Sequence, residues 1–303
     1  MLRDIVDWPH TSINEDGKIS LGEDDSFVYT DYNVVVNAFH YIAVKTLAKI
    51  ASEIGATNDA IRYKEYVRDF IDVFNSSFLN RKDSLYVDGV GVSHSSLHAN
   101  MFPLAFGVVP EEYKPAITRY IISRGMACSV YGAQFLLEAL FNACEADLAI
   151  RYLTSESDRS WMNMLREGAT ITMEAWGNSV KKDQDWIHAW GTAPANIIQF
   201  RLIGIKPISP GFDSIEIRPQ IGTLKEVHAA VPSPKGQIIV DIKCDKFIFE
   251  VPSTISADVY IPQPSYEYSV LMNGKEVDIE IKDGFIHLLE RICGKMIIDI
   301  IHL

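Results

Sequence analysis

The stretch Lys206–Phe212, KPISPGF, separates two parts of the chain that have different hydrophobic periods. It carries two prolines and a glycine, which favour a break between structural elements. Before it, apolar residues recur every three to four positions, as they do on one face of a helix. After it, they alternate with polar residues or form short β-branched runs, as in strands. We therefore predict a helical domain over residues 1–205 and a β domain over residues 206–303.

The first part is predicted to alternate apolar helices with amphipathic ones. Thr30-Asp31 is placed to cap a helix that runs to Gly55 and is apolar on nearly all sides, so we expect it to be buried. The next helix, Asp59 to Leu79, has one apolar stripe and one polar face. This repeated alternation indicates two concentric helical layers. Further helices are predicted at 95–106, 111–124, 130–144, 145–153, 158–166 and 186–203, the last of them kinked or split at Pro194.

The second part is predicted to form an antiparallel β-sandwich. Asn273-Gly274 and Asp283-Gly284 are strong signals for two-residue hairpin turns. Since its aromatic residues are scattered over separate runs, we expect this domain to be structural. Strands are predicted at 214–218, 237–243, 246–251, 257–261, 269–272, 276–281, 285–289 and 295–302.

Composition and charge exclude some classes of partner. The formal net charge of -12 disfavours nucleic acid and anionic membranes. No window of about 18 uninterrupted apolar residues occurs, so no membrane-spanning helix is expected. The four cysteines are far apart and lack nearby ligand partners, so we expect buried thiols and neither a metal nor a cofactor. Nothing in this pattern specifies a compartment, and the N-terminus does not resemble a signal peptide.

The segment Gly168–Gly191 carries the most unusual combination of residues. It contains Glu174, Asp185, His188 and three of the five tryptophans of the chain. Part of it has no clear period, which predicts a loop, and loops on a rigid scaffold carry function. Aromatic rings stack on the C–H face of a pyranose while carboxylates bond hydroxyl groups or transfer protons. The segment therefore indicates a sugar site, although core tryptophans and a solvated Glu174 would also account for it.

An ordered series of motifs resembles the closing part of the bacterial α-L-rhamnosidases of glycoside hydrolase family 78. The motifs follow one another over nearly the whole chain. They are IVDWP (5–9), TDYNVVVNAFHY (30–41), HSSLHANMFPLAFGVVP (94–110), RGMACSVYGAQFLLEAL (124–140), GATITMEAW (168–176), DWIHAWGTAPANII (185–198) and LIGIKPISPGFDSIEIRPQIG (202–222). The resemblance implies part of an (α/α)6 barrel followed by a β-sandwich, and inverting hydrolysis of terminal α-L-rhamnosides without a metal.

The resemblance also implies roles for individual residues. Glu174 matches the glutamate that acts as general base. His188 matches a histidine that bonds sugar hydroxyl groups, and Trp176 and Trp190 match walls of the sugar pocket. Asp7 and Trp8 match a segment that faces the sugar. Tyr32 and Asn33 are as consistent with helix capping as with ligand contact, and His98 is expected to be structural.

One departure from the family pattern is that its general acid, in an R-D-E type segment, has no counterpart here. We therefore expect an incomplete barrel that self-associates through uncovered apolar surface. A rhamnose-containing glycoside or oligosaccharide is the expected partner. An inactive carbohydrate-binding relative and an (α/α)6 glycosidase for another sugar remain as alternatives. Other carboxylates of this part of the chain are Asp4, Glu15, Asp16, Asp24 and Asp25, but INEDGKISLGEDD (13–25) is interpreted as a solvated loop, so none of them is expected to replace the acid.

Overall fold

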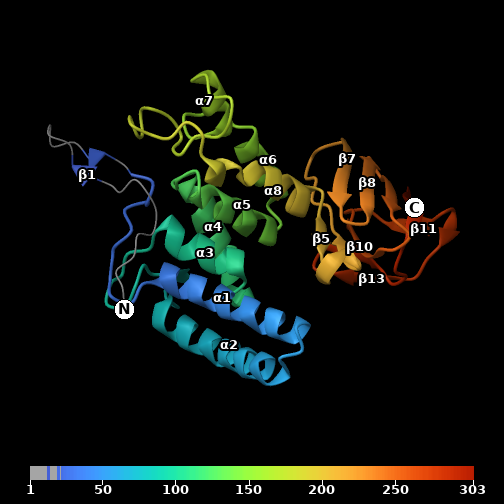
Figure 1. Ribbon diagram of the computed structural model, residues 1–303, viewed down its shortest axis with the longest axis horizontal. Coiled ribbons are helices and arrows are strands. Elements are labelled where there is room, and N and C mark those ends of the chain that lie inside the picture. The colour runs from blue at the N-terminus through green and yellow to red at the C-terminus, as the bar shows by residue number, and fades with distance from the viewer. Residues whose placement is uncertain (1–11, 14–18, 21) are drawn as a thin grey trace. The chain divides into compact units, whose positions relative to one another are not determined.

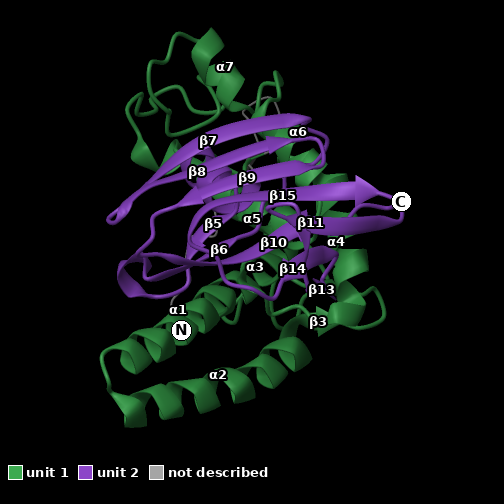
Figure 2. Ribbon diagram, turned by 90° about the vertical axis from the view of Figure 1, so that its right-hand side faces the viewer, with its two compact units in different colours: residues 1–193 green, residues 194–303 purple. Residues whose placement is uncertain are grey.

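A computed structural model describes residues 12–13, 19–20 and 22–303 of the chain. The chain divides into two compact units, residues 1–193 and residues 194–303, which Figure 2 colours separately. The first unit is helical and the second is built from sheets, so the fold class predicted from the change of period is confirmed. The domain boundary at 205/206 stays a prediction.

The helices of the first unit form two layers. Each odd-numbered helix from α1 to α5 contacts the helix that follows it, and α3 also contacts α1 and α5. This pattern gives an inner row of α1, α3 and α5 backed by α2, α4 and α6; Figure 1 shows α1 beside α2. The helices are α1 (Val34–Glu53), α2 (Thr57–Phe78), α3 (Leu97–Phe106), α4 (Lys114–Arg124), α5 (Gly132–Asn142), α6 (Ala146–Leu153) and α7 (Trp161–Arg166). Two short hairpins accompany them, β1 (Ser12–Ile13) with β2 (Ile19–Ser20) and β3 (Leu79–Asn80) with β4 (Leu85–Tyr86).

Helix α1 differs from the prediction in its cap and in its burial. Its N-cap is Asn33, whose side chain accepts the backbone N–H of Val36, and not Thr30-Asp31. Leu47, Ile50 and Ile54 are exposed, so the expectation of a buried helix was wrong. Among the described helices, α1 has α3 as its neighbour in the inner row, whereas α3 lies between two neighbours. Helix α1 is long and apolar enough to span a membrane, but core helices of soluble proteins meet the same criteria.

Residues 22–25, in the segment before α1, are buried and are anchored to the helical unit. Glu23, Asp24 and Asp25 are buried, which corrects the sequence interpretation. The Asp25 carboxylate pairs with Arg124 and accepts the backbone N–H of Leu97 at the start of α3. These contacts give Asp25 a structural role; Asp4, Glu15 and Asp16 lie outside the described residues.

The second unit contains two sheets whose apolar residues face a common core. The five-stranded sheet has the order β13-β14-β10-β6-β5 and the six-stranded sheet has the order β12-β11-β15-β9-β8-β7. Alternate residues are buried on the central strands, as the period of two predicts. The strands are β5 (Ile205–Pro207), β6 (Ser214–Ile217), β7 (Glu226–Ser233), β8 (Gly236–Lys243), β9 (Lys246–Val251), β10 (Ser256–Pro262), β11 (Tyr268–Met272), β12 (Lys275–Glu276), β13 (Ile279–Lys282), β14 (Phe285–Leu288) and β15 (Gly294–His302).

The two predicted hairpin turns are confirmed. Asn273-Gly274 joins β11 to β12 and Asp283-Gly284 joins β13 to β14. All four residues have positive φ, as type I′ turns require. One strand pair departs from the antiparallel prediction, since β6 and β10 pair in parallel.

Two proline positions account for further differences. Strand β7 was not predicted; it contains Pro232 and lies at the edge of its sheet, where proline is tolerated. A helix over 186–203 was expected to be kinked or split at Pro194. The α-helix begins only at α8 (Ala193–Ile197), with Pro194 in its first turn, where proline is well tolerated; a 3-10 turn at Ala189–Gly191 precedes it and a π-helical turn at Ile198–Leu202 follows.

The cysteines correct one more prediction. Cys128 is a buried thiol as expected, but Cys144, Cys244 and Cys293 are exposed. Cys144 and Cys244 have positive φ, which places both of them in turns at the surface.

Candidate functional site

The loop that follows α7 folds back on itself, so that the backbone of residues 172–174 is hydrogen-bonded to that of residues 185–188. The N–H of His188 donates to the carbonyl oxygen of Thr172 (2.9 Å), and the N–H of Glu174 donates to that of Asp185 (2.9 Å). Gly191 closes the arrangement, because a Cβ there would lie 2.8 Å from the Cβ of Thr172. Residues from both ends of the loop are thereby brought together.

Both carboxylate oxygens of Glu174 have a hydrogen-bond donor. Nζ of Lys181 lies 2.5 Å from Oε1, and the backbone N–H of Asp185 donates to Oε2 at 3.0 Å. The side chain of Glu174 is 15% exposed, so the ion pair is partly shielded from water. The Lys181 hydrogen bond and, next, the Asp185 N–H hold the pKa of Glu174 below its usual value. Glu174 is therefore an ionised acceptor that remains reachable from solvent.

Three aromatic or charged side chains surround this carboxylate. The indole N–H of Trp190 donates to the carbonyl oxygen of Glu174 (3.2 Å), and the rings of His188 and Trp190 are 4.2 Å apart. Nδ1 of His188 lies 3.2 Å from Oδ2 of Asp185, and the N–H of Ile187 and this histidine lower the pKa of Asp185. Trp190 is 39% exposed and contacts the ring of Tyr131 at 5.6 Å. A carboxylate, an imidazole and an open indole face thus share one surface.

Trp176 does not belong to this surface, which corrects its predicted role as a pocket wall. Its side chain has no exposed area, its Nε1 donates to the carbonyl oxygen of Cys128 (2.7 Å), and its ring meets that of Trp161 edge to face at 5.0 Å. Met173 and Ala175 are buried like Trp176, whereas Glu174 is only partly buried. Trp176 is a core residue that anchors the loop.

The remaining predicted site residues divide into three groups. Asp7 and Trp8 lie outside the described residues. Asn33 caps α1 and Tyr32 beside it is exposed. His98 is fully buried, consistent with a structural residue.

Lys181 and Tyr131 were missed by sequence reasoning. Lys181 lies in a stretch without a clear period, so no pattern indicated that its side chain turns back to Glu174. Tyr131 precedes α5 and meets Trp190 only through the fold. The order of motifs along the chain was the one available signal for Tyr131, since it lies within the matched stretch 124–140.

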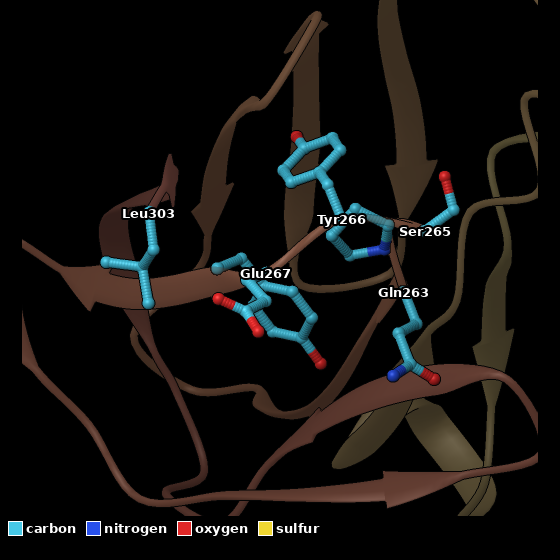
Figure 3. Close-up of a pocket in the computed structure, with 7 residues that line it drawn as sticks. Gln263, Ser265, Tyr266, Glu267 and Leu303 are labelled. Atoms are coloured by element: carbon cyan, nitrogen blue, oxygen red, sulfur yellow. The ribbon is translucent and has the colours of Figure 1, made fainter.

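Within the described part of the chain, no group of three His, Cys, Asp or Glu side chains is arranged to hold a metal ion. A pocket of about 470 Å³ in the second unit contains none of the predicted site residues; Figure 3 shows Gln263, Ser265, Tyr266, Glu267 and Leu303 at its walls. The expectation that the second unit is structural stays a prediction.

Comparison with protein families gives two matches in the order of the two units. The family model described as bacterial alpha-L-rhamnosidase 6 hairpin glycosidase domain matches residues 2–201. The model described as bacterial alpha-L-rhamnosidase C-terminal domain matches residues 204–276.

Two curated relatives, both named α-L-rhamnosidase, are much longer than this chain. An α-L-rhamnosidase of Alteromonas sp. (strain LOR) is 26% identical over 271 residues, which cover 83% of this chain and 29% of the relative. One from Formosa agariphila is 25% identical over 257 residues, 78% of this chain and 27% of the relative. The chain therefore spans less than a third of the length of these relatives.

Solved structures show the same fold. The α-L-rhamnosidase from Dictyoglumus thermophilum superposes with a TM-score of 0.73 at 20% identity, over 88% of this chain and 31% of that one. The Streptomyces avermitilis α-L-rhamnosidase complexed with L-rhamnose gives 0.71 at 20% identity, over 88% of this chain and 26% of that one.

Proposed function

Because the chain belongs to the bacterial α-L-rhamnosidase family, we propose that it contributes to inverting hydrolysis of terminal α-L-rhamnosides, with Glu174 as the general base and with no general acid assigned among its residues. The observation that carries the proposal is the grouping of an ionised Glu174 with His188 and the exposed ring of Trp190. These are the residue types that a site for a neutral sugar requires.

The chemistry follows from the geometry of inverting hydrolysis. A carboxylate on one face of the sugar ring removes a proton from the water that attacks C1, while a second carboxyl group protonates the departing oxygen. The carboxyl groups of such enzymes stand roughly 6.5–9.5 Å apart, which leaves room for the water. Glu174 can accept this proton because its carboxylate is charged at neutral pH and is not fully covered.

Binding is assigned to the neighbours of Glu174. The face of Trp190 offers an apolar platform for the C–H face of rhamnose. His188, oriented through Asp185, bonds sugar hydroxyl groups. The substrate class is a rhamnose-containing glycoside or oligosaccharide.

Glu174→Gln tests the proposal directly. The variant keeps the size of the side chain but not its basicity, so kcat on p-nitrophenyl α-L-rhamnoside should fall by about 10²–10⁴-fold. Asp183→Asn removes an exposed carboxylate from the same loop and serves as the matched control. Activity of Glu174→Gln near that of the parent would rule out the assignment.

Two further measurements separate the alternatives. NMR of the first anomer released distinguishes inversion from retention. L-rhamnose binding, followed by tryptophan fluorescence, together with no hydrolysis at all would indicate a carbohydrate-binding relative. Faster cleavage of a different p-nitrophenyl glycoside would indicate a glycosidase for another sugar.

A further inference from the structure

Lys181 contacts the proposed base through its ammonium group, although no motif indicated a role for it. We propose that Lys181 is a positioning residue that holds the Glu174 carboxylate in the orientation and charge state that a general base needs. The inference rests on the proposed function, because it concerns how that same base is prepared. Lys181 itself is not assigned a contact with the sugar.

The contact is specific to one oxygen. Nζ of Lys181 lies 2.5 Å from Oε1, and Oε2 is already bonded by the N–H of Asp185. Two donors from one short stretch of loop therefore fix both the position and the plane of the carboxylate. A charge-assisted bond of this kind is stronger and more directional than a neutral one.

Partial burial makes the pair more effective than a surface ion pair. The side chains of Lys181 and Glu174 are 26% and 15% exposed. Exposed pairs contribute little because water and salt screen them, and screening weakens as a pair is covered. The charge on Lys181 therefore acts on Glu174 and not mainly on solvent.

The other charged groups near Glu174 form a pair of their own. His188 and Asp185 face each other at 3.2 Å, and His188 and Lys181 both favour the charged form of Glu174. The hydrogen bond from Lys181 is the largest cause of the lowered pKa of Glu174, and the Asp185 N–H is the next. Removing the ammonium group should therefore let the carboxylate take up a proton at a higher pH.

Hydrogen bonds that do not involve the Lys181 side chain also hold the loop. Gln184 accepts the N–H of Ala175 (3.0 Å) and donates to Asn178 (3.2 Å), and the N–H of Asn178 donates to Glu167 (3.0 Å). These bonds remain when Lys181 is replaced. A neutral variant is therefore expected to fold.

The test compares Lys181→Met with Lys181→Arg and Lys182→Met. Arginine keeps the charge, methionine keeps much of the length without it, and Lys182 is an exposed neighbour. The first readout is the pH titration of the Glu174 side-chain carboxyl resonance in protein labelled with [5-13C]glutamate, with Glu174→Gln to assign it. The second is the pH dependence of kcat and KM on p-nitrophenyl α-L-rhamnoside in the same full chain.

Lys181→Met should move both the Glu174 titration midpoint and the acid limb of kcat/KM to higher pH. The plateau value of kcat should fall, and KM should not change. Lys181→Arg should restore the parental profile, and Lys182→Met should not change it. A Lys181→Met titration that superimposes on the parent overturns the inference. Full activity of Glu174→Gln would instead refute the proposed function, while the resonance titration would still report whether Lys181 controls Glu174.

Discussion

Replacing Trp176 by alanine should destabilise the helical unit much more than Trp190→Ala does. Trp176 has no exposed area and fills space against Trp161. Truncation of a buried tryptophan costs about 3–5 kcal/mol. Leaving the carbonyl oxygen of Cys128 without its donor adds about 1–3 kcal/mol. Because a domain is stable by only about 5–15 kcal/mol, this loss is a large share of the total.

Trp190→Ala removes a ring that is 39% exposed and that makes tilted contacts with the rings of His188 and Tyr131. Lost ring contacts of this kind cost about 1 kcal/mol. The change should instead weaken L-rhamnose binding. The two tryptophans, close together in the sequence, are therefore expected to affect different properties.

Urea unfolding followed by far-UV circular dichroism measures the first effect, and titration calorimetry with L-rhamnose measures the second. Trp176→Phe, which keeps most of the ring but not the N–H donor, should fall between the parent and Trp176→Ala. An unfolding midpoint of Trp176→Ala equal to that of the parent would refute the reasoning. So would a Trp190→Ala variant with parental affinity for L-rhamnose.

Three further predictions follow from the same contacts. Gly191→Ala should lower both the melting temperature and L-rhamnose affinity, because its Cβ would press on Thr172 at 2.8 Å; parental values in both assays would contradict this. Because the pKa of Glu174 is lower in the folded protein, the unfolded chain protonates this carboxylate at a higher pH than the folded protein does. The charged carboxylate therefore stabilises the fold above the ordinary pKa of 4.5, and this contribution is lost as the pH falls through the folded pKa. Glu174→Gln should flatten that part of the curve of unfolding free energy against pH, measured by urea titration. The exposed Ile50 on α1 should support self-association, so Ile50→Lys should shift sedimentation toward the monomer, and an unchanged profile would speak against it.

Local patterns were sufficient where the backbone itself sets the structure. The helices from α1 to α7 were all predicted close to their bounds, because apolar spacing and end signals are local properties. The turns at Asn273-Gly274 and Asp283-Gly284 were predicted for the same reason, since few residues tolerate two successive positive φ angles. Strand β7 was missed because its edge position, which makes Pro232 acceptable, is a property of the whole sheet.

The candidate site was located by the sequence but not resolved by it. The sequence alone determined that Glu174 lies in a tryptophan-rich loop after a helical hairpin, and its motif order pointed to the family. It did not determine which tryptophan is buried, since Trp176 and Trp190 are each preceded by an alanine and followed by a glycine. Tertiary packing decided that Trp176 fills the core and that Lys181 returns to Glu174. Burial and contacts within an aperiodic loop depend on where its anchors hold it, and no local periodicity encodes those anchors.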